Sequence, residues 1–225
     1  MIKNLLLDVD GTLLDFNAAA EASLRTLFAG RGYEWSEAVF PLYEKINQGL
    51  WEQYEKGLLP REKVLVNRFT MLFERLSINE KGETFEKDFR EELSEHAILM
   101  EGAIEILDYL KPKYGLYVVT NGIAETQRKR MAASGLDRYM VKSFVSEKIG
   151  SQKPQKEFFD YCFAHIENCD SDELILIGDS LSADILGANN AGIQSIWLNT
   201  KGTPNPGPAK PDHEIRSLPE LKTLL

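Results

Sequence analysis

The sequence contains few cysteines and few histidines. Its 225 residues include two cysteines and three histidines. Cys162 and Cys169 are separated by seven positions in an expected helix, which puts their Cα atoms about 10 Å apart along its axis, too far for a disulfide. We therefore expect two free thiols and a reducing compartment. His96, His165 and His213 are scattered singly, without the spacing of a metal site, so we expect surface or structural histidines.

Long hydrophobic runs and an excess of basic residues are also missing. Nowhere do about 18 apolar residues follow one another, as a transmembrane helix requires. Lys3 is followed by only three leucines before Asp8, so we expect no secretion signal. Lys and Arg number 26 against 35 Asp and Glu, a net charge of −9, whereas nucleic acids and anionic membranes attract basic surfaces. We expect a cytoplasmic protein without a nucleic-acid or membrane partner, and no obligate protein partner is evident.

Hydrophobic periodicity divides the chain into two parts. Residues 17–97 have a helical period and predict four helices in a small bundle. Ser36 is expected to cap the second helix, and Pro60 to lie in the first turn of the third. After residue 100, short apolar runs alternate with helices, which is typical of a parallel sheet. At least five strands are predicted, within residues 4–9, 115–122, 139–146, 173–180 and 194–199.

These patterns predict an α/β fold whose core is interrupted after its first strand. Residues 1–16 and 98–225 would form a Rossmann-like core of three layers with a parallel sheet, and residues 17–97 an inserted helical cap domain. The segment 202–212, rich in Pro and Gly, is expected to be a surface loop.

Acidic side chains follow two of the predicted strands. The opening stretch KNLLLDVDGTLLDF runs from leucines into acids around one glycine, and the run 174–177 leads into GDSLSAD. Asp-Gly between apolar runs is also typical of a β-hairpin, but the residues that follow have a helical period. Ligands of parallel α/β sheets bind at the carboxyl ends of strands, so we expect the acids to converge there. The acids are Asp8, Asp10, Asp15, Asp179 and Asp184.

Converging carboxylates restrict what the site can be. Two of them about 4 Å apart repel by roughly 4 kcal/mol at an effective dielectric of 20. Several together rival the roughly 5–15 kcal/mol by which a domain is stable. Either a cation is bound, or some acids are protonated, or the acids do not converge. Oxygen ligands without a His or Cys cluster favour a hard ion, and Mg²⁺ suits a few carboxylates with waters and a phosphate.

Two further strand ends carry groups suited to an anion. Thr120 and Asn121 stand where a helix begins, and they offer a hydroxyl and unpaired backbone amides. Lys153 precedes Pro154, which can open a helix. Taken singly, the first is a common turn and the second a common solvated charge. The four segments nevertheless occur in order at four strand ends.

Together the segments DVDGTLLD, VVTNG, GSQKP and GDSLSAD resemble the four motifs of the haloacid dehalogenase-like (HAD) hydrolase superfamily. The resemblance covers nearly the whole chain, since the helical insert resembles the C1 cap of that superfamily. Four other segments are similar to the noncanonical pyrimidine 5′-nucleotidase subfamily: INQGLWEQYEKG, NRF, TNGIAETQRKRMAASGL and WLN.

The resemblance implies a phosphatase that uses Mg²⁺. Asp8 would be the nucleophile that becomes an aspartyl phosphate, and Asp10 would be the general acid and base. Gly11 would let the backbone approach the phosphoryl group. The implied phosphate-binding residues are Gly11, Thr120, Asn121 and Lys153, and the implied Mg²⁺ ligands are Asp8, Asp10 through its carbonyl, Asp179 and Asp184.

Asp10 favours phosphate esters over haloacids, because a halide leaving group needs no proton. The resemblance implies a small-molecule substrate, a nucleoside 5′-monophosphate with a pyrimidine base. A sugar-phosphate or phosphoglycolate phosphatase and a phosphomutase are alternatives, and so is a noncatalytic phospholigand-binding protein, which would be expected to lack the nucleophile.

Substrate choice is expected to lie with the helical insert. Its aromatic residues could stack on a pyrimidine ring, or they could fill the core of the bundle. Asn47 matches the subfamily pattern without a role that the sequence reveals. The candidates are Phe16, Asn47, Trp51 and Tyr54.

Overall fold

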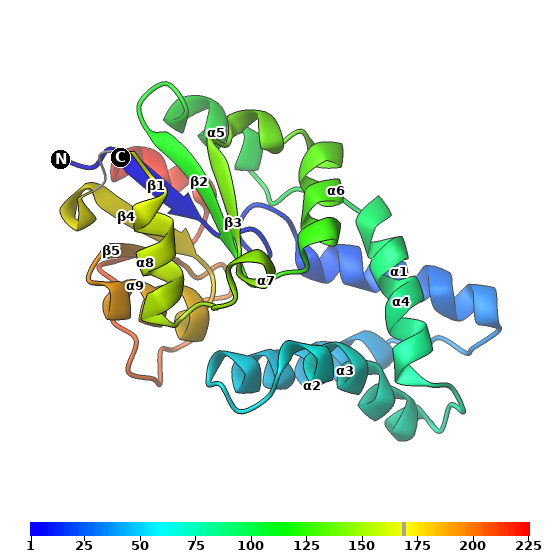
Figure 1. Cartoon of the computed structure of the whole chain (residues 1–225). Coiled ribbons are helices and arrows are strands. Elements are labelled where there is room, and N and C mark those ends of the chain that lie inside the picture. Colours follow the sequence, from blue (N-terminus) through cyan, green and yellow to red (C-terminus); the bar gives the residue numbers. More distant parts are fainter. Residues whose placement is uncertain (168–169) are drawn as a thin grey trace. The chain divides into compact units, whose positions relative to one another are not determined.

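The computed structural model describes residues 1–167 and 170–225. The chain divides into two compact units. The α/β unit consists of residues 1–15 and 98–225, and the helical unit consists of residues 16–97. The predicted α/β fold with a parallel sheet is confirmed (Figure 1).

The α/β unit is built on one parallel sheet of six strands in the order β3-β2-β1-β4-β5-β6. Leu5 of the central strand β1 pairs with Leu116 on one side and Ile175 on the other. The strand order reverses between β1 and β4, and ligands of such sheets bind at this point. The short edge strand β6 was not predicted. The strands are β1 (Asn4–Leu7), β2 (Gly115–Thr120), β3 (Lys142–Val145), β4 (Leu174–Gly178), β5 (Gln194–Leu198) and β6 (His213–Ile215).

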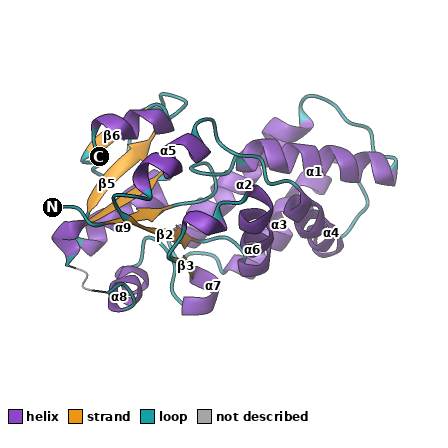
Figure 2. Ribbon diagram, turned by 90° about the horizontal axis from the view of Figure 1, so that it is seen from above, coloured by secondary structure: helices purple, strands orange, loops and turns teal. Residues whose placement is uncertain are grey.

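Helices cover both faces of this sheet, as Figure 2 shows for α5 and α8. Leu5 and Leu7 face the cluster that contains Leu107 of α5, whereas Leu6 faces the cluster that contains Phe158 of α8. This alternation follows from the period of two along a strand, and it gives the three predicted layers. The helices are α5 (Ala103–Leu110), α6 (Ala124–Ser134), α7 (Ser146–Ile149), α8 (Lys156–Ala164) and α9 (Leu186–Ala191). Short helical turns span Asp137–Tyr139, Ser171–Glu173, Leu181–Ile185 and Leu218–Thr223.

Several smaller predictions concern this unit. The segment 202–212 is the largely exposed loop between β5 and β6, as expected. α8 ends at Ala164, earlier than predicted; Cys162 within it is a buried free thiol, and Cys169 lies outside the described residues. Within the described part of the chain, the acidic cluster that could hold a metal contains no histidine. No helix there is long and apolar enough to cross a membrane.

The helical unit contains the four predicted helices, and its core is largely aromatic. Phe69 lies at the centre, with the rings of Phe85 and Phe89 at 4.8 and 4.9 Å between centroids. The helices are α1 (Phe16–Arg31), α2 (Val39–Glu55), α3 (Arg61–Leu76) and α4 (Gly82–Glu95).

The predicted start of α2 is wrong. Its first residue is Val39, and Ala38 rather than Ser36 occupies the capping position. Pro41 explains the shift. In a helix capped by Ser36, Pro41 would be the fifth residue, where an N–H must bond within the helix. With Val39 first, Pro41 is the third residue, whose N–H has no intrahelical partner to lose.

A buried ion pair joins α3 and α4 inside the helical unit. Arg68 donates to both carboxylate oxygens of Glu86 at 2.9 and 3.0 Å. Its remaining Nη1 donates to Tyr43 Oη and Asn47 Oδ1, each at 3.1 Å. Trp51 Nε1 donates to the same Asn47 oxygen at 3.2 Å, so the orientation of the Asn47 amide is fixed by two donors.

Candidate active site

The loop after β1 turns sharply without forming a hairpin. Gly11 has a φ of +88°, and the amides of Leu13 and Leu14 donate back to the carbonyl of Val9 at 2.9 and 2.8 Å. The chain then enters α1 at Phe16, so the hairpin alternative is excluded. This compact turn holds the residues after β1 at the carboxyl end of the sheet.

Three acids from the two central strands converge. Carboxylate oxygens of Asp8, Asp179 and Asp184 all lie within 4.8 Å of one another. Asp8 follows β1 and the other two follow β4, so the pairing of these strands brings together residues more than 170 positions apart. Asp10 lies outside this cluster of three carboxylates, and so does Asp15.

Two glycines leave room for the acidic cluster. A Cβ on Gly11 would lie 2.3 Å from Asp179 Oδ2, and one on Gly178 would lie 2.3 Å from the carboxyl group of Asp184. Real Cβ atoms do not approach so closely, and the positive φ of Gly11 adds strain for any other residue. The structure thus explains why a glycine is needed at position 11, which the sequence did not reveal: its missing side chain makes space for Asp179.

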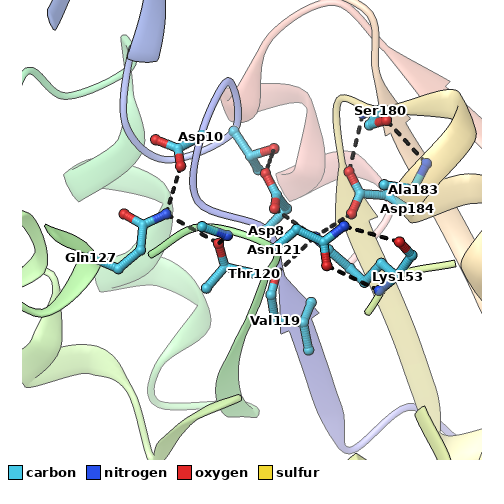
Figure 3. A network of polar contacts seen from close by, with 12 residues as sticks. Asp8, Asp10, Val119, Thr120, Asn121, Gln127, Lys153, Ser180, Ala183 and Asp184 are labelled. Carbon is cyan, nitrogen blue, oxygen red and sulfur yellow. Dashed lines mark hydrogen bonds and ion pairs between the residues drawn. The ribbon is translucent and has the colours of Figure 1, made fainter. Parts of the chain in front are cut away.

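Lys153 is the cation of this cluster. Its buried Nζ donates to Asp8 Oδ1 at 2.6 Å, to Asp184 Oδ1 at 2.7 Å and to the carbonyl of Val119 at 2.8 Å (Figure 3). The ammonium group therefore bridges two of the acids and uses all three of its hydrogens.

Asn121 holds the backbone of Lys153 in place. The Asn121 side-chain amide donates to the Lys153 carbonyl at 2.9 Å, and its Oδ1 accepts from the Lys153 amide at 3.0 Å (Figure 3). Predicted as a phosphate ligand, Asn121 thus contacts the lysine that faces the acids.

The electrostatics of the cluster are unbalanced, because one ammonium group faces three carboxyl groups. Burial raises the pKa of Asp8 to about 7, Lys153 opposes this shift, and Asp184 adds to it. The pKa of Asp179 is raised well above its ordinary value. The first cause is that neighbouring protein atoms displace water from the carboxyl group, and the charges of Asp8 and Asp184 add to it, although Asp179 is partly exposed to solvent. Burial would lower the pKa of Lys153, but Asp184 and Asp8 raise it. A hard divalent cation on these oxygens would complete the charge balance.

A second group of residues surrounds Asp10. Gln127 Nε2 donates to Asp10 Oδ2 at 2.6 Å and to Thr120 Oγ1 at 3.1 Å, and Arg130 Nη1 donates to Asp10 Oδ1 at 2.5 Å. The backbone amide of Gly122 donates to Thr120 Oγ1 at 3.0 Å. Sequence reasoning missed Gln127 and Arg130. Their spacing of three on one helix face was a signal that they act together, but it did not say what they face.

Two further contacts were also missed. Thr12 Oγ1 donates to Asp8 Oδ2 at 3.2 Å, so both oxygens of Asp8 have a donor. Trp197 of β5 donates from Nε1 to the carbonyl of Asp179 at 2.9 Å and thereby fixes the loop after β4. Neither residue type signals such a contact in a sequence.

The predicted specificity residues lie in the helical unit. Tyr54 is buried with Leu50 and Val64, and Trp51 packs edge-on against it at 5.5 Å between ring centroids. Asn47 is buried, and Phe16 packs against the aromatic core. For Tyr54 the structure agrees with the alternative that these rings fill the bundle.

Residues 5–198 match the model of the haloacid dehalogenase-like hydrolases. The chain belongs to this family. It is 40% identical over 223 residues to the HAD-hydrolase YfnB of Bacillus subtilis, covering 99% of this chain and 95% of YfnB. The crystal structure of YfnB bound to magnesium superposes with a TM-score of 0.95 at 39% identity, covering 100% of this chain and 98% of that one.

Two pyrimidine 5′-nucleotidases are also similar to this member of the HAD family. PynA of Streptococcus pneumoniae is 35% identical, covering 99% of this chain and 94% of PynA. YjjG of Escherichia coli is 30% identical, covering 97% of this chain and 95% of YjjG. The predicted superfamily and the predicted class, a phosphoric monoester hydrolase, are thereby confirmed.

Proposed function

We propose that this HAD hydrolase is a Mg²⁺-dependent phosphatase that acts on nucleoside 5′-monophosphates, preferentially those of pyrimidines, through an aspartyl phosphate. The observation that carries the chemistry is the convergence of Asp8, Asp179 and Asp184 around the ammonium group of Lys153 at the carboxyl end of β1 and β4. The similarity to PynA and YjjG supports the substrate class.

In the first half-reaction, a carboxylate oxygen of Asp8 attacks the phosphorus atom. The bond from phosphorus to the ester oxygen breaks, and protonated Asp10 gives its proton to the departing alkoxide. The hydroxyl of Thr120 holds a phosphoryl oxygen, and the positive charge of Lys153 beside Asp8 stabilises the negative charge of the phosphoryl group. The products of this step are the free alcohol, ionised Asp10 and a phosphoryl group on Asp8.

In the second half-reaction, ionised Asp10 accepts a proton from a water molecule as that water attacks the phosphorus atom. The bond from phosphorus to Asp8 breaks, which releases inorganic phosphate and restores both acids to their starting states. The missing side chain of Gly11 leaves room for Asp179, and Asn121 keeps Lys153 in place.

Mg²⁺ fits the donor set, because the three carboxylates exceed the one ammonium group in charge and offer only hard oxygen ligands. Asp8, the carbonyl of Asp10, Asp179 and Asp184 would hold it. When bound, the ion neutralises negative charge on the carboxylates and the phosphoryl group.

Removal of divalent cations is expected to reduce phosphate release to background. Without a cation, the repulsion among Asp8, Asp179 and Asp184 extends to any phosphate that approaches them. The measurement is phosphate release from a nucleoside monophosphate after EDTA treatment and after Mg²⁺ is added back. EDTA already saturated with Mg²⁺ is the control, and activity that survives EDTA would contradict this proposal.

Substitution of Asp10 by asparagine is expected to slow turnover by about 10²- to 10⁴-fold, the usual contribution of a general acid or base. The amide keeps the shape of the side chain but transfers no proton. The measurement is kcat for a nucleoside monophosphate, with Asp137→Asn, an exposed acid of the same unit, as the matched control. A near-normal rate would move the acid and base role to another residue.

A panel of phosphate esters tests the substrate class. With Mg²⁺ present, we expect the highest kcat/KM for the 5′-monophosphates of uridine, cytidine or thymidine, measured against purine nucleotides, sugar phosphates and phosphoglycolate. A best substrate without a base would reject the nucleotidase assignment and leave the phosphatase chemistry standing. Isomerisation without phosphate release would indicate a phosphomutase, and binding without any turnover a noncatalytic protein.

Selection of the base is part of this proposal. Phe16 and Trp51 are half-buried aromatic residues of the helical unit, and buried Tyr54 packs against Trp51. Asn47 supplies an amide held by Arg68 and Trp51. Stacking on a pyrimidine and hydrogen bonding to its ring carbonyls are the interactions that such groups offer.

A further inference from the structure

The face of α6 that contains Gln127 and Arg130 is buried although the helix is polar. Gln127 is 4% exposed and Arg130 is 1% exposed. A buried amide and a buried guanidinium need hydrogen-bond partners, because an unpaired one loses its hydration without compensation. Both residues find a partner in Asp10, which follows β1 rather than β2.

Both carboxylate oxygens of Asp10 accept a hydrogen bond from a side chain of α6. Oδ2 accepts from Gln127 at 2.6 Å, and Oδ1 accepts from Arg130 at 2.5 Å (Figure 3 shows the first of these). Two donors on two different oxygens fix the plane of the carboxyl group as well as its position. Helix α6 follows β2 in the chain, and β2 is the neighbour of β1 in the sheet. Asp10, on the loop after β1, is therefore oriented by a helix that follows the neighbouring strand.

The second contact of Gln127 decides what Thr120 can do. A threonine hydroxyl has one hydrogen to donate and two lone pairs that accept. Thr120 Oγ1 accepts from the Gly122 amide at 3.0 Å and from Gln127 Nε2 at 3.1 Å, so both lone pairs are used (Figure 3). The hydroxyl hydrogen is then the group left for a phosphoryl oxygen, which can only accept.

The orientation of the Gln127 amide follows from the same contacts. Its Nε2 faces Asp10 Oδ2 and Thr120 Oγ1, and each of these oxygens takes one of the two hydrogens of the amide. Turning the amide over would put Oε1 against the Asp10 carboxylate and leave Thr120 free to point its hydrogen away from the phosphate.

We propose that Gln127 is a positioning residue that aligns the acid and base Asp10 and at the same time directs the hydroxyl of Thr120 toward the phosphoryl group. Arg130 supports the first task through its contact with Asp10, and its Nη1 also donates to Gln127 Oε1 at 3.5 Å. This role rests on the proposed phosphatase function.

The test uses Gln127→Met, which keeps the length of the side chain and removes both donors. Two readouts separate the two tasks. The inhibition constant of inorganic phosphate reports on Thr120. The ratio of kcat/KM between a nucleoside monophosphate, whose alkoxide needs a proton, and p-nitrophenyl phosphate, whose phenolate leaves without one, reports on Asp10.

For Gln127→Met we expect the inhibition constant of phosphate to rise by roughly 3- to 10-fold, as for the loss of one hydrogen bond. We expect kcat/KM to fall by about 10- to 100-fold for the nucleoside monophosphate, but only by about the 3- to 10-fold of the lost phosphate contact for p-nitrophenyl phosphate. Arg130→Met should change the ratio between the substrates, and it should raise the phosphate constant by less than Gln127→Met does, because Thr120 keeps the Gln127 donor. Lys129→Gln, on the exposed side of the same helix, is the control and should match the wild type in both.

Gln127→Glu provides a second variant of the same shape. Its carboxylate cannot donate to Thr120 and repels Asp10, so the same pattern is expected with larger factors. All variants are assayed well below their melting temperatures. A uniform loss on both substrates with an unchanged phosphate constant would mean a purely structural role and would overturn the proposal, as would wild-type behaviour. A wild-type protein that cleaves neither ester would instead overturn the phosphatase function itself.

Discussion

Substitution of Asp8 by asparagine is expected to abolish phosphate release. The amide has the size of the carboxylate and can remain between Lys153 and Thr12, but it has no ionised oxygen to form the bond to phosphorus. The measurement is release of inorganic phosphate from a nucleoside monophosphate at saturating Mg²⁺, over hours, so that slow turnover is detected.

Asp172→Asn is the matched control for this substitution, because Asp172 is an exposed acid of the same unit. It should turn over at the wild-type rate. Robust phosphate release by the Asp8 variant would refute the covalent role, whatever the metal dependence of the wild type.

The same variant should also change how stability depends on pH. In the metal-free protein, burial raises the pKa of Asp8 from 3.8 to about 7, so the folded chain binds this proton more tightly than the unfolded chain does. The contribution to stability is therefore present below about pH 4 and is lost as the pH rises toward 7, by about 1.4 kcal/mol for each unit of the shift. In EDTA, the melting temperature of Asp8→Asn should fall less over this range than that of the wild type.

Substitution of Lys153 by methionine is expected to destabilise the protein and to remove its activity. Methionine keeps the apolar stem but leaves Asp8, Asp179 and Asp184 without their buried cation. Removing one partner of a buried ion pair costs about 3–5 kcal/mol, which corresponds to a fall in melting temperature of roughly 10 °C for a chain of this length.

A feature of the Lys153 variant distinguishes charge from packing. Added Mg²⁺ should raise its melting temperature more than that of the wild type, because the ion supplies the positive charge that the variant lacks. Lys156→Met, in which an exposed lysine of α8 loses only its surface pair with Asp160, should melt close to the wild type. A Lys153 variant as stable as the wild type, with or without Mg²⁺, would show that the acids are not held together by this ammonium group.

The parts of the fold that sequence predicted are those that local patterns determine. The strands β1, β2, β4 and β5 each contain a short run of buried apolar residues, and in a parallel sheet such runs need little further context. Strand β6 was missed because His213 and Glu214 are exposed and its three residues carry no hydrophobic pattern.

Some residues of the candidate site could likewise be predicted from local sequence patterns, and others could not. Asp8 and Asp179 could be placed together because each follows a buried strand, and strand ends of a parallel sheet share one edge. The roles of Gln127 and Arg130 depend instead on the rotation of α6 about its own axis, which its polar sequence does not indicate. The bridging position of Lys153 depends on the side chain of Asn121, a contact across 32 positions that no local pattern encodes.

The α/β unit itself closes the gap where the helical unit is inserted. The amide of Asp15 donates to the carbonyl of Ile98 at 2.9 Å, and the amide of Met100 donates to the carbonyl of Leu13 at 3.0 Å. The outgoing and returning segments thus run hydrogen-bonded beside each other, as the two arms of a hairpin would. Deletion of residues 16–97 would leave two ends that a short turn can join, so the inserted segment can be exchanged or lengthened in evolution without altering the register of any strand of the sheet.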